Sequence, residues 1–100
     1  MNLKQIQQYI NDNYKISFKE DEYGYEPALF YKTKKDEFYI YLSEDFKNRK
    51  HIGYDVMRNN RLMGCNGGYI IKDNIEELID YIMQEDFNFK RIASKQLSLF

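Results

Sequence analysis

Between residues 28 and 71, four short segments rich in apolar and aromatic residues are separated by polar residues. The segments are residues 28–33, 37–42, 51–58 and 61–71. Lys34-Lys35-Asp36 suits a short connection between the first two. Asn59-Asn60 joins the last two, and asparagine tolerates the left-handed backbone that both central positions of a two-residue hairpin turn require. The pattern predicts two successive β-hairpins.

Apolar residues at helical spacing lie on either side of these segments. The first set is Leu3, Ile6, Ile10 and Tyr14, and the second is Ile75, Leu78, Ile79, Ile82 and Met83. Both sets form one stripe of a helix. Asn2 is a suitable N-cap for the first helix. Asp73 and Glu76 have the spacing of a capping box, so we expect the second helix to begin there and to run to about Gln84 or Asp86.

The segment between the first helix and the first hairpin is less regular. Ile16 and Phe18 alternate with polar residues, which predicts a short, half-buried strand. Residues 20–27 contain the only proline and four acids, so we expect a solvated loop there. A chain of 100 residues, 43% of them hydrophobic, can bury one core. We therefore predict one α+β domain, residues 1–89, with an antiparallel sheet of about five short strands and both the N-terminal and C-terminal helix packed on one face.

Facing Arg58 with Arg61 sets an expected register for the second hairpin. This register pairs Val56 with Met63 and Tyr54 with Cys65, and it brings His51 near Gly67. The residues expected to share the core face are Ile52, Tyr54, Val56, Met63 and Cys65. The glycines of the return strand, Gly64, Gly67 and Gly68, indicate a bulge or a close backbone approach.

The charge balance and the cysteine content exclude several classes of protein. The 15 basic and 16 acidic residues give a formal net charge of -1, which supplies no overall field for binding nucleic acid or an anionic membrane. One cysteine and one histidine exclude an internal disulfide and a zinc site made of four such ligands. Apolar runs are short, and polar residues interrupt the N-terminal segment. We expect a cytoplasmic protein with no membrane segment, metal or cofactor.

The most specific pattern in the sequence is Gln96-Leu97-Ser98-Leu99-Phe100. This segment resembles the bacterial sliding-clamp-binding motif, Gln-Leu-Ser/Asp-Leu-Phe, which replicative and translesion polymerases, mismatch-repair proteins and other clamp clients carry. All five positions match. At residue frequencies of roughly 4 to 10% per type, such a match at one stated position arises by chance about once in a million. The resemblance concerns this segment alone.

The resemblance implies a role for each residue. In clamp clients the glutamine hydrogen-bonds in a small polar subsite, and the first leucine and the final Leu-Phe pair enter a hydrophobic groove. Here these residues are Gln96, Leu97, Leu99 and Phe100. Residues 90–100 carry a charge of +3 and residues 1–89 a charge of -4, so we expect a flexible basic tail that presents the motif. The alternative is that the apolar residues fold back onto the domain.

The other chemistry-bearing residues have simpler interpretations. The segment 64–68 lacks the lysine and hydroxyl residue of a phosphate-binding loop. Cys65 would have a base only if the expected register brought His51 close, and a buried thiol is the simpler interpretation. The acids Glu20, Asp21, Glu22 and Glu26 lack the ligand spacing of a calcium loop. Glu76, Glu77 and Asp80 complement the dipole of the second helix. We expect no catalytic site.

Tyr39 and Tyr41 alternate with Phe38, Ile40 and Leu42, so we expect them on the sheet face that is turned away from the core. Tyrosine stabilises sheets by packing alone. If no helix covers that face, the two tyrosines are a candidate interface for a second protein. Basic residues near them are few, so direct binding of nucleic acid is not expected.

Two functions of different classes follow. The first is a non-catalytic adaptor or modulator that docks on the bacterial DNA sliding clamp through residues 96–100. The abundance of residues with A/T-rich codons favours a phage or mobile-element origin. Docking would either recruit the domain to replication forks or displace other clients. The alternative is a small anti-defence inhibitor, for example of a host nuclease, that acts through the surface of the domain.

Overall fold

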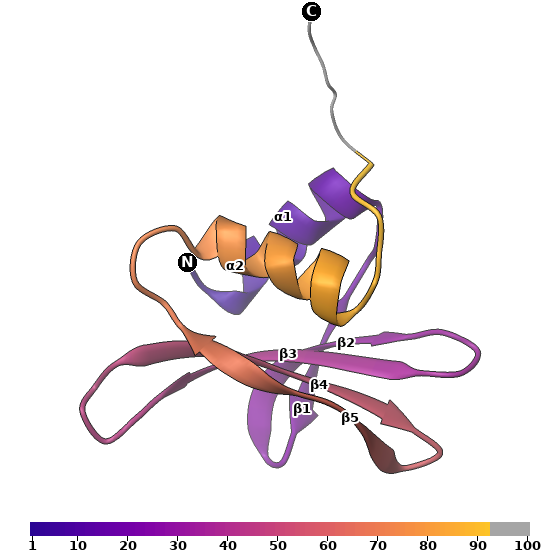
Figure 1. Ribbon diagram of the computed structural model, residues 1–100, viewed down its shortest axis with the longest axis horizontal. Helices are drawn as coiled ribbons and strands as arrows, with labels where there is room; N and C mark the ends of the chain where they lie inside the picture. Colours follow the sequence, from indigo (N-terminus) through magenta and orange to yellow (C-terminus); the bar gives the residue numbers. More distant parts are fainter. Residues whose placement is uncertain (93–100) are drawn as a thin grey trace, which may run out of the picture.

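The computed structural model describes residues 1–92, apart from the side chains of residues 64–66. The chain forms two layers, with an antiparallel sheet below and both helices on one of its faces (Figure 1). The five strands are ordered β1-β2-β3-β4-β5, so each pairs with its neighbours along the chain. The predicted α+β class is confirmed. None of the described helices is long and apolar enough to cross a membrane.

Helix α1, Leu3–Tyr14, begins and ends where local chemistry favours it. The Gln5 backbone amide donates to the Asn2 side chain at 2.9 Å, and the Asn2 amide donates to the Gln5 side chain at 2.8 Å, which completes a capping box. Lys15 ends the helix in the left-handed conformation. The buried residues are Ile6, Ile10 and Tyr14, as the helical spacing predicted.

The two predicted hairpins are confirmed. β2, Glu26–Lys32, pairs with β3, Glu37–Glu44. β4, Lys50–Arg58, pairs with β5, Arg61–Ile70. Between β4 and β5, Asn59 and Asn60 have φ angles of 52° and 63°. These are the left-handed values that a two-residue hairpin turn requires, and asparagine reaches them at lower steric cost than most residues.

The region before β2 differs from the expectation. β1 is Lys19–Tyr23 rather than the segment of Ile16 and Phe18, and residues 20–27 form a hairpin rather than a loop. Even Pro27 lies in β2, opposite Glu22. Four of the five side chains of β1 are exposed, so the strand carries no alternating apolar pattern. Backbone pairing with β2 forms it, and an apolar pattern cannot reveal such a strand.

A bulge changes the register of the second hairpin. Arg58 faces Arg61 as expected, but further along the strand Tyr54 faces Gly67, two residues beyond the expected partner Cys65. Val56, expected opposite Met63, lies at the irregularity between Asp55 and Met57. The expected register is therefore wrong beyond the first two pairs, whereas the bulge that the glycines indicated is confirmed.

The core face of this hairpin is confirmed in part. Ile52, Tyr54 and Val56 are buried, but Met63 is 40% exposed. The side chain of Cys65 lies outside the described residues. A Cβ atom at Gly68 would stand 2.9 Å from the Ile52 carbonyl oxygen, so the strands approach closely there.

Helix α2, Ile75–Tyr81, continues into the π-helical turn η1, Ile82–Asp86. Its N-cap is Asn74, whose side chain accepts a hydrogen bond from the Glu76 amide at 2.9 Å. The capping box expected at Asp73 is therefore wrong by one residue. The predicted stripe is confirmed, because Ile79, Ile82 and Met83 are fully buried and Ile75 and Leu78 pack against the core.

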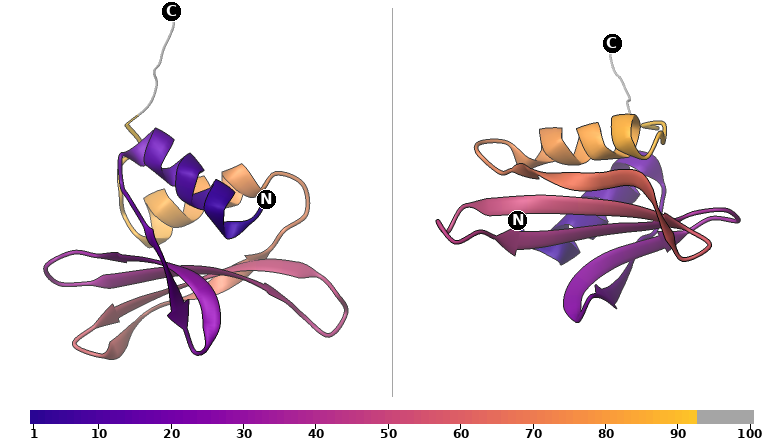
Figure 2. Two further views of the ribbon diagram at one scale, coloured as in Figure 1. Left: turned by 180° about the vertical axis from the view of Figure 1, so that it is seen from behind. Right: turned by 60° about the horizontal axis from the view of Figure 1, so that its bottom comes forward.

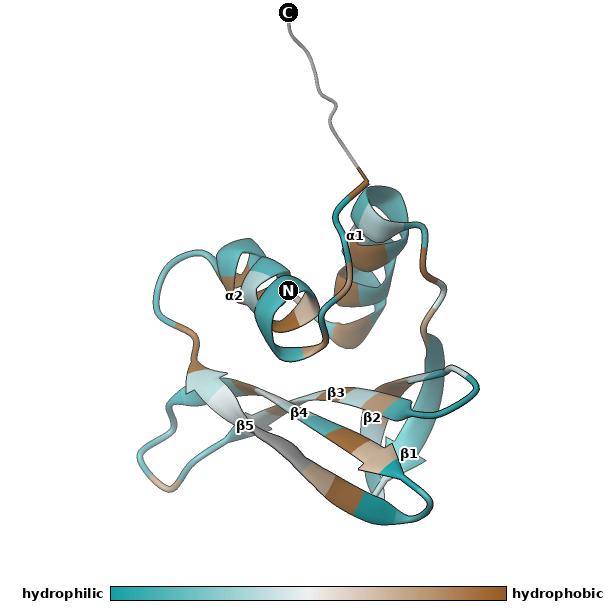
Figure 3. Cartoon of the chain, turned by 45° about the vertical axis from the view of Figure 1, so that its right-hand side comes forward, coloured by the Kyte–Doolittle hydropathy of each residue, from teal (hydrophilic) through white to brown (hydrophobic). Residues whose placement is uncertain are grey.

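The core lies between the sheet and the two helices (Figure 2). Figure 3 shows hydrophobic residues on both helices and on the strands below them. After η1, Phe87 and Phe89 close one end of the core against Phe38, with ring centroids 4.8 Å and 5.0 Å away. The chain then passes to the end of α1, where the Ile92 amide donates a hydrogen bond to the Asn13 carbonyl.

Candidate functional site

Residues 96–100, which match the clamp-binding motif, lie outside the described residues, as do residues 93–95. The structure describes the two residues that precede this segment, Arg91 and Ile92. The Ile92 amide donates a hydrogen bond to the Asn13 carbonyl at 2.8 Å, and the Arg91 guanidinium donates one to the Asn13 side chain at 2.8 Å. Arg91 and Ile92, which the charge pattern assigns to the tail, are therefore attached to the last turns of α1.

Asp80 of α2 is the centre of the network that holds Arg91. Its carboxylate accepts hydrogen bonds from the Tyr9 hydroxyl at 2.9 Å, the Tyr14 hydroxyl at 2.7 Å and the Arg91 guanidinium at 2.7 Å. Arg91 also donates to the Tyr9 hydroxyl at 3.1 Å. One carboxylate thus joins α1, α2 and the segment after η1. We call Tyr9, Asn13, Tyr14, Asp80 and Arg91 the Asp80 anchor.

Burial sets the protonation of the anchor tyrosines. Desolvation raises the pKa of both Tyr9 and Tyr14, and hydrogen bonding to Asp80 raises both further, because a phenolate beside a carboxylate is unfavourable. The hydrogen bond to Tyr9 is the main cause of the raised pKa of Arg91, and Asp80 adds to it. The two phenols therefore remain neutral hydrogen-bond donors and Arg91 remains a cation.

The sequence interpretation of Asp80 as a dipole-compensating acid missed this network. Tyr14 and Tyr9 lie 66 and 71 residues away along the chain, so no local spacing reveals the contact. Only an indirect indication was present in the sequence. Tyr9 and Asp80 each lie next to the apolar stripe of a predicted helix, and both helices were expected to pack on the same face of the sheet.

The Asp80 anchor lies in the helical layer, so residue 92 is on the side of the domain opposite the outer face of the sheet (Figures 1 and 2). Four Cα–Cα steps separate Ile92 from Gln96, and they span at most about 14 Å when fully extended. Gln96 therefore lies within about 14 Å of the Ile92 Cα atom.

The second candidate site is the outer face of the sheet, which neither helix covers (Figure 2). Tyr39 and Tyr41 lie on this face, as the alternation of β3 predicted, and both are partly exposed. The Tyr23 ring of β1 stacks on them, with centroid distances of 4.3 Å to Tyr39 and 5.9 Å to Tyr41. Phe30 of β2 packs against Tyr39 at 5.1 Å. We call these four rings the aromatic layer.

Asp55 of β4 lies beneath the aromatic layer and is only 6% exposed. The hydroxyls of Tyr23 and Tyr41 hydrogen-bond to it. Burial is the main cause of the raised pKa of both tyrosines, and Asp55 adds to it. A Cβ atom at Gly53 would collide with the Tyr41 ring, so glycine lets that ring lie across β4. The tyrosines therefore stabilise the sheet itself, and their role as an interface stays a prediction.

A groove of about 740 Å³ lies between the ends of β3 and β4 and the first residues of both helices, with His51 on its wall. His51 Nε2 lies 3.0 Å from the Asp45 carboxylate, which also accepts from Arg49 Nε at 2.7 Å. The contact with His51, followed by the backbone and side-chain hydrogen bonds of Arg49, holds the pKa of Asp45 well below its usual range. Because Asp45 also accepts the Lys47 amide, these bonds shape the β3–β4 loop.

The expected proximity of His51 and Gly67 is wrong. The bulge shifts β5, so that His51 faces Ile70 while Gly67 faces Tyr54. The observed register therefore gives no support to His51 as a general base for Cys65. Among the residues that the structure describes, no group of three or more histidine, cysteine or acidic residues could hold a metal ion.

No protein-family model, curated protein or solved structure matches the chain. Its function is therefore argued from its own residues: the segment 96–100 that matches the clamp-binding motif, the anchor that precedes it, and the outer face of the sheet.

Proposed function

We propose that this protein is a non-catalytic adaptor or modulator that docks on the bacterial DNA sliding clamp through residues 96–100. The observation that carries the proposal is the full match of Gln96-Leu97-Ser98-Leu99-Phe100 to the clamp-binding motif. The proposal implies a bacterial cytoplasmic site of action and fits a phage or mobile-element origin.

The geometry of the domain supports this proposal. The Asp80 anchor fixes residues 91 and 92 on the helical layer, and residues 93–95 provide a short spacer before Gln96. A clamp bound to the motif would face the helical layer and leave the outer face of the sheet accessible to a second protein. Docking and a separate contact by the domain are therefore sterically compatible.

The expected affinity is modest. Burying Leu97, Leu99 and Phe100 contributes roughly 1.5 to 3 kcal/mol for each side chain. Ordering a peptide takes several kcal/mol back. The net value is about -8 kcal/mol at best, which corresponds to a micromolar dissociation constant. Such binding is transient, as exchange among competing clients would require.

Isothermal titration calorimetry with a purified bacterial clamp tests docking. Gln96→Ala and Phe100→Ala should each weaken binding about tenfold or more, because each removes one anchor group. Ser98→Asp is the matched control, since the motif accepts either residue, and it should preserve the affinity. Equal binding by the wild-type chain and a chain lacking residues 96–100 would end the proposal.

Recruitment and inhibition are distinguished by a second assay. If the protein displaces other clients, it should lower clamp-dependent DNA synthesis by a polymerase, and Phe100→Ala should restore it. If it recruits its domain, synthesis should continue at concentrations that saturate the clamp in calorimetry.

The alternative function, a small anti-defence inhibitor, is favoured by one observation: Tyr39 and Tyr41 remain partly exposed on the face that neither helix covers. Inhibition of a host nuclease that survives deletion of residues 96–100 would support this alternative. Loss of that inhibition on deletion would instead assign it to clamp docking.

A further inference from the structure

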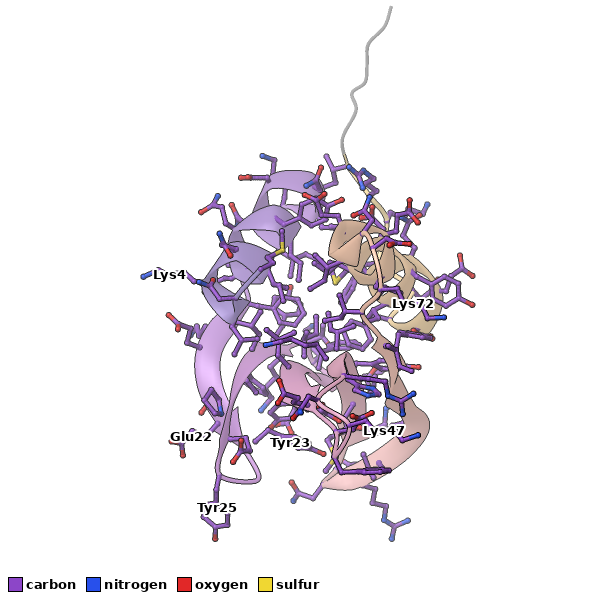
Figure 4. The ribbon with its side chains drawn as sticks, turned by 90° about the vertical axis from the view of Figure 1, so that its left-hand side faces the viewer. Lys4, Glu22, Tyr23, Tyr25, Lys47 and Lys72 are labelled. Carbon is purple, nitrogen blue, oxygen red and sulfur yellow. The ribbon has the colours of Figure 1, made fainter. Side chains whose placement is uncertain are left out.

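The sheet has two edge strands, and only one of them is protected against the addition of a further strand. β1 and β5 are these strands, because the strand order follows the chain (Figure 3). Four of the five residues of β1 are charged, and Figure 4 shows one of them, Glu22, directed away from the domain. Charged side chains on an edge strand oppose strand addition. β1 therefore carries its own protection.

β5, the other edge strand, lacks such charges. Residues 62–71 are the longest uncharged segment of the chain, and they contain no proline. Arg61 is the single charged residue of β5, and no other described helix or strand is free of acidic residues. A long edge strand with so few charges is a template for pairing with another strand.

The backbone of β5 is open along this edge. Beyond the bulge, residues 66–70 pair regularly with β4, and the Ile71 amide donates to the Lys50 carbonyl at 2.8 Å. Because inward and outward groups alternate along an antiparallel strand, Gly68 and Ile70 direct their N–H and C=O groups to the edge. In the described part of the chain, no turn, loop or side chain forms a hydrogen bond with these groups. Gly68 is exposed, so another backbone can approach it.

Exposed apolar side chains gather beside this edge. Among the described residues, seven large hydrophobic side chains are exposed, and three of the seven lie on β5 or against it. Leu62 and Met63 belong to β5 itself. Tyr81 of α2 is the third, and its ring packs edge-on against Tyr69 of β5 with a centroid distance of 5.6 Å. Apolar surface and open backbone therefore coincide at β5.

We propose that β5 is the interface of a homodimer, in which β5 of one copy pairs with β5 of a second copy in antiparallel orientation. The pairing is symmetric about a two-fold axis, and it continues the antiparallel sheet of one domain into the other. Main-chain hydrogen bonds from Gly68 and Ile70 contribute to the affinity, as in other cases of strand addition. The interface is separate from residues 96–100 and does not depend on clamp docking.

The properties of β5 favour a second copy over an unrelated protein as the partner. A strand that adds to β5 must be extended, uncharged and open along one side, and β5 of a second copy meets all three requirements. Residues 1–89 carry a charge of -4, so two copies repel each other at surfaces that contain acids, whereas β5 contributes none. A strongly charged partner, in contrast, would find no complementary charges on this edge.

Sedimentation equilibrium of the full chain over a wide concentration range tests the dimer. The mass should rise from the 12.2 kDa of one chain to twice that value. In the dimer, the amide protons of Gly68 and Ile70 should exchange more slowly with solvent than in the dilute protein, because they become hydrogen-bonded. A chain that stays monomeric at the highest concentration would refute the proposal, and so would association that leaves these two amides unprotected.

Ile70→Pro tests the role of the open backbone. Proline removes the outward N–H group of residue 70 but leaves the hydrogen bonds between β5 and β4, as edge strands tolerate. The dissociation constant of the dimer should rise about tenfold or more, since two main-chain bonds are lost by symmetry. Ile70→Ala is the matched control, because it also shortens the side chain but keeps the amide, and its affinity should stay within about threefold of wild type. Equal affinities of these two variants would contradict strand pairing.

Ile70→Lys keeps the proposal testable if proline disturbs the fold, which circular dichroism reveals. A lysine on the edge strand brings like charges together in the dimer, so the dissociation constant should rise about fivefold or more. Phe46→Lys is the control, because it makes the same change in net charge at an exposed apolar residue of the β3–β4 loop, and it should alter the affinity less than about twofold. Equal losses would show that net charge, not the β5 edge, sets the association.

Salt distinguishes this interface from one held by opposite charges. Sodium chloride should leave the affinity of the dimer unchanged or raise it, because β5 contributes no ion pairs and salt screens the acids elsewhere on the two domains. A dimer that salt weakens about tenfold would be held by opposite charges, and the assignment to β5 would then be wrong.

Discussion

Two acidic residues, Asp80 and Asp55, each accept hydrogen bonds from two tyrosine hydroxyls. They connect different parts of the molecule. Asp80 accepts hydrogen bonds from Tyr9, Tyr14 and Arg91, so its charge is balanced by a cation. Asp55 is hydrogen-bonded by Tyr23 and Tyr41. The first carboxylate connects elements that are distant along the chain, and the second connects β1 and β3 to β4. At each site, tyrosine contributes a hydroxyl as well as its ring.

Asp80→Asn should reveal how strongly the anchor stabilises the fold. The asparagine amide has about the same size as the carboxylate but carries no negative charge. It therefore interacts more weakly with the Arg91 guanidinium and the two tyrosine hydroxyls. The free energy of unfolding should fall by about 1 to 2 kcal/mol, since the group is partly exposed and solvent screens part of the ion pair. Urea denaturation followed by circular dichroism measures this change. Glu77→Gln, on the exposed side of α2, is the control; an equal effect of both substitutions would contradict the assignment.

Six fully or partly buried tyrosines predict a loss of stability at alkaline pH. Burial raises the pKa of six tyrosines above 10, the value of the free side chain: Tyr9, Tyr14, Tyr23, Tyr39, Tyr41 and Tyr69. The folded state therefore holds these protons more tightly than the unfolded state does. The resulting stability is fully present below pH 10 and decreases as the pH rises above it.

Absorbance at the tyrosinate band checks this sign. Above about pH 10, the folded protein should show less tyrosinate than the same protein unfolded in urea at equal pH. The difference should disappear at the pH where the fold is lost. Identical titration curves for the folded and unfolded protein would contradict the expectation.

At the scale of secondary-structure elements, the sequence predicted those elements whose signal is local. Asn59-Asn60 between two strand-like segments predicted the β4–β5 turn, and the spacing of Ile6, Ile10 and Tyr14 predicted α1. β1 was missed because its exposed residues carry no apolar pattern. The register shift in β5 depends on how a glycine-rich strand fits its neighbour. Neither the Asp80 anchor nor the packing of Tyr23 on Tyr39 could be predicted, because both require elements that only the tertiary fold brings together.

The β4–β5 turn offers a test of this local reasoning. Asn60→Gly should stabilise the protein by about 0.5 to 1 kcal/mol, because glycine reaches positive φ angles more readily than asparagine. Asn60→Ala should destabilise it by about 1 kcal/mol, since a Cβ atom without a local hydrogen-bonding group opposes the left-handed conformation. Thermal unfolding of the two variants measures both effects, and a change of the same sign in both would contradict the turn geometry.

Across the whole molecule, the charged residues are grouped differently from what the sequence suggested. The charge of +3 assigned to residues 90–100 includes Arg91, which the domain uses to neutralise Asp80. The acids of the domain lie on both layers: residues 20–26 of the β1–β2 hairpin, where Figure 4 labels Glu22, carry four, and residues 73–86 of the helical layer carry six with no basic residue. Acidic charge therefore does not distinguish one layer of the domain from the other.

In the proposed docking on the clamp, the Asp80 anchor would make the number of residues between Ile92 and Gln96 important for affinity. Deleting residues 93–95 would bring Gln96 directly after Ile92, which is hydrogen-bonded to α1, so the domain should obstruct the clamp. We expect about a tenfold loss of affinity, whereas replacing the same residues by Gly-Ser-Gly should keep affinity within about threefold, because length rather than identity matters.

Arg91→Ala in the shortened chain distinguishes this geometry from a direct role of residues 93–95 in binding. Without the guanidinium contacts to Asp80 and Asn13, residues 91 and 92 can leave α1 and serve as a replacement spacer. Calorimetry with the clamp should then show recovery of most of the lost affinity, although the domain itself is slightly less stable. If affinity stays low, residues 93–95 contact the clamp themselves, and the anchor only fixes the end of the domain.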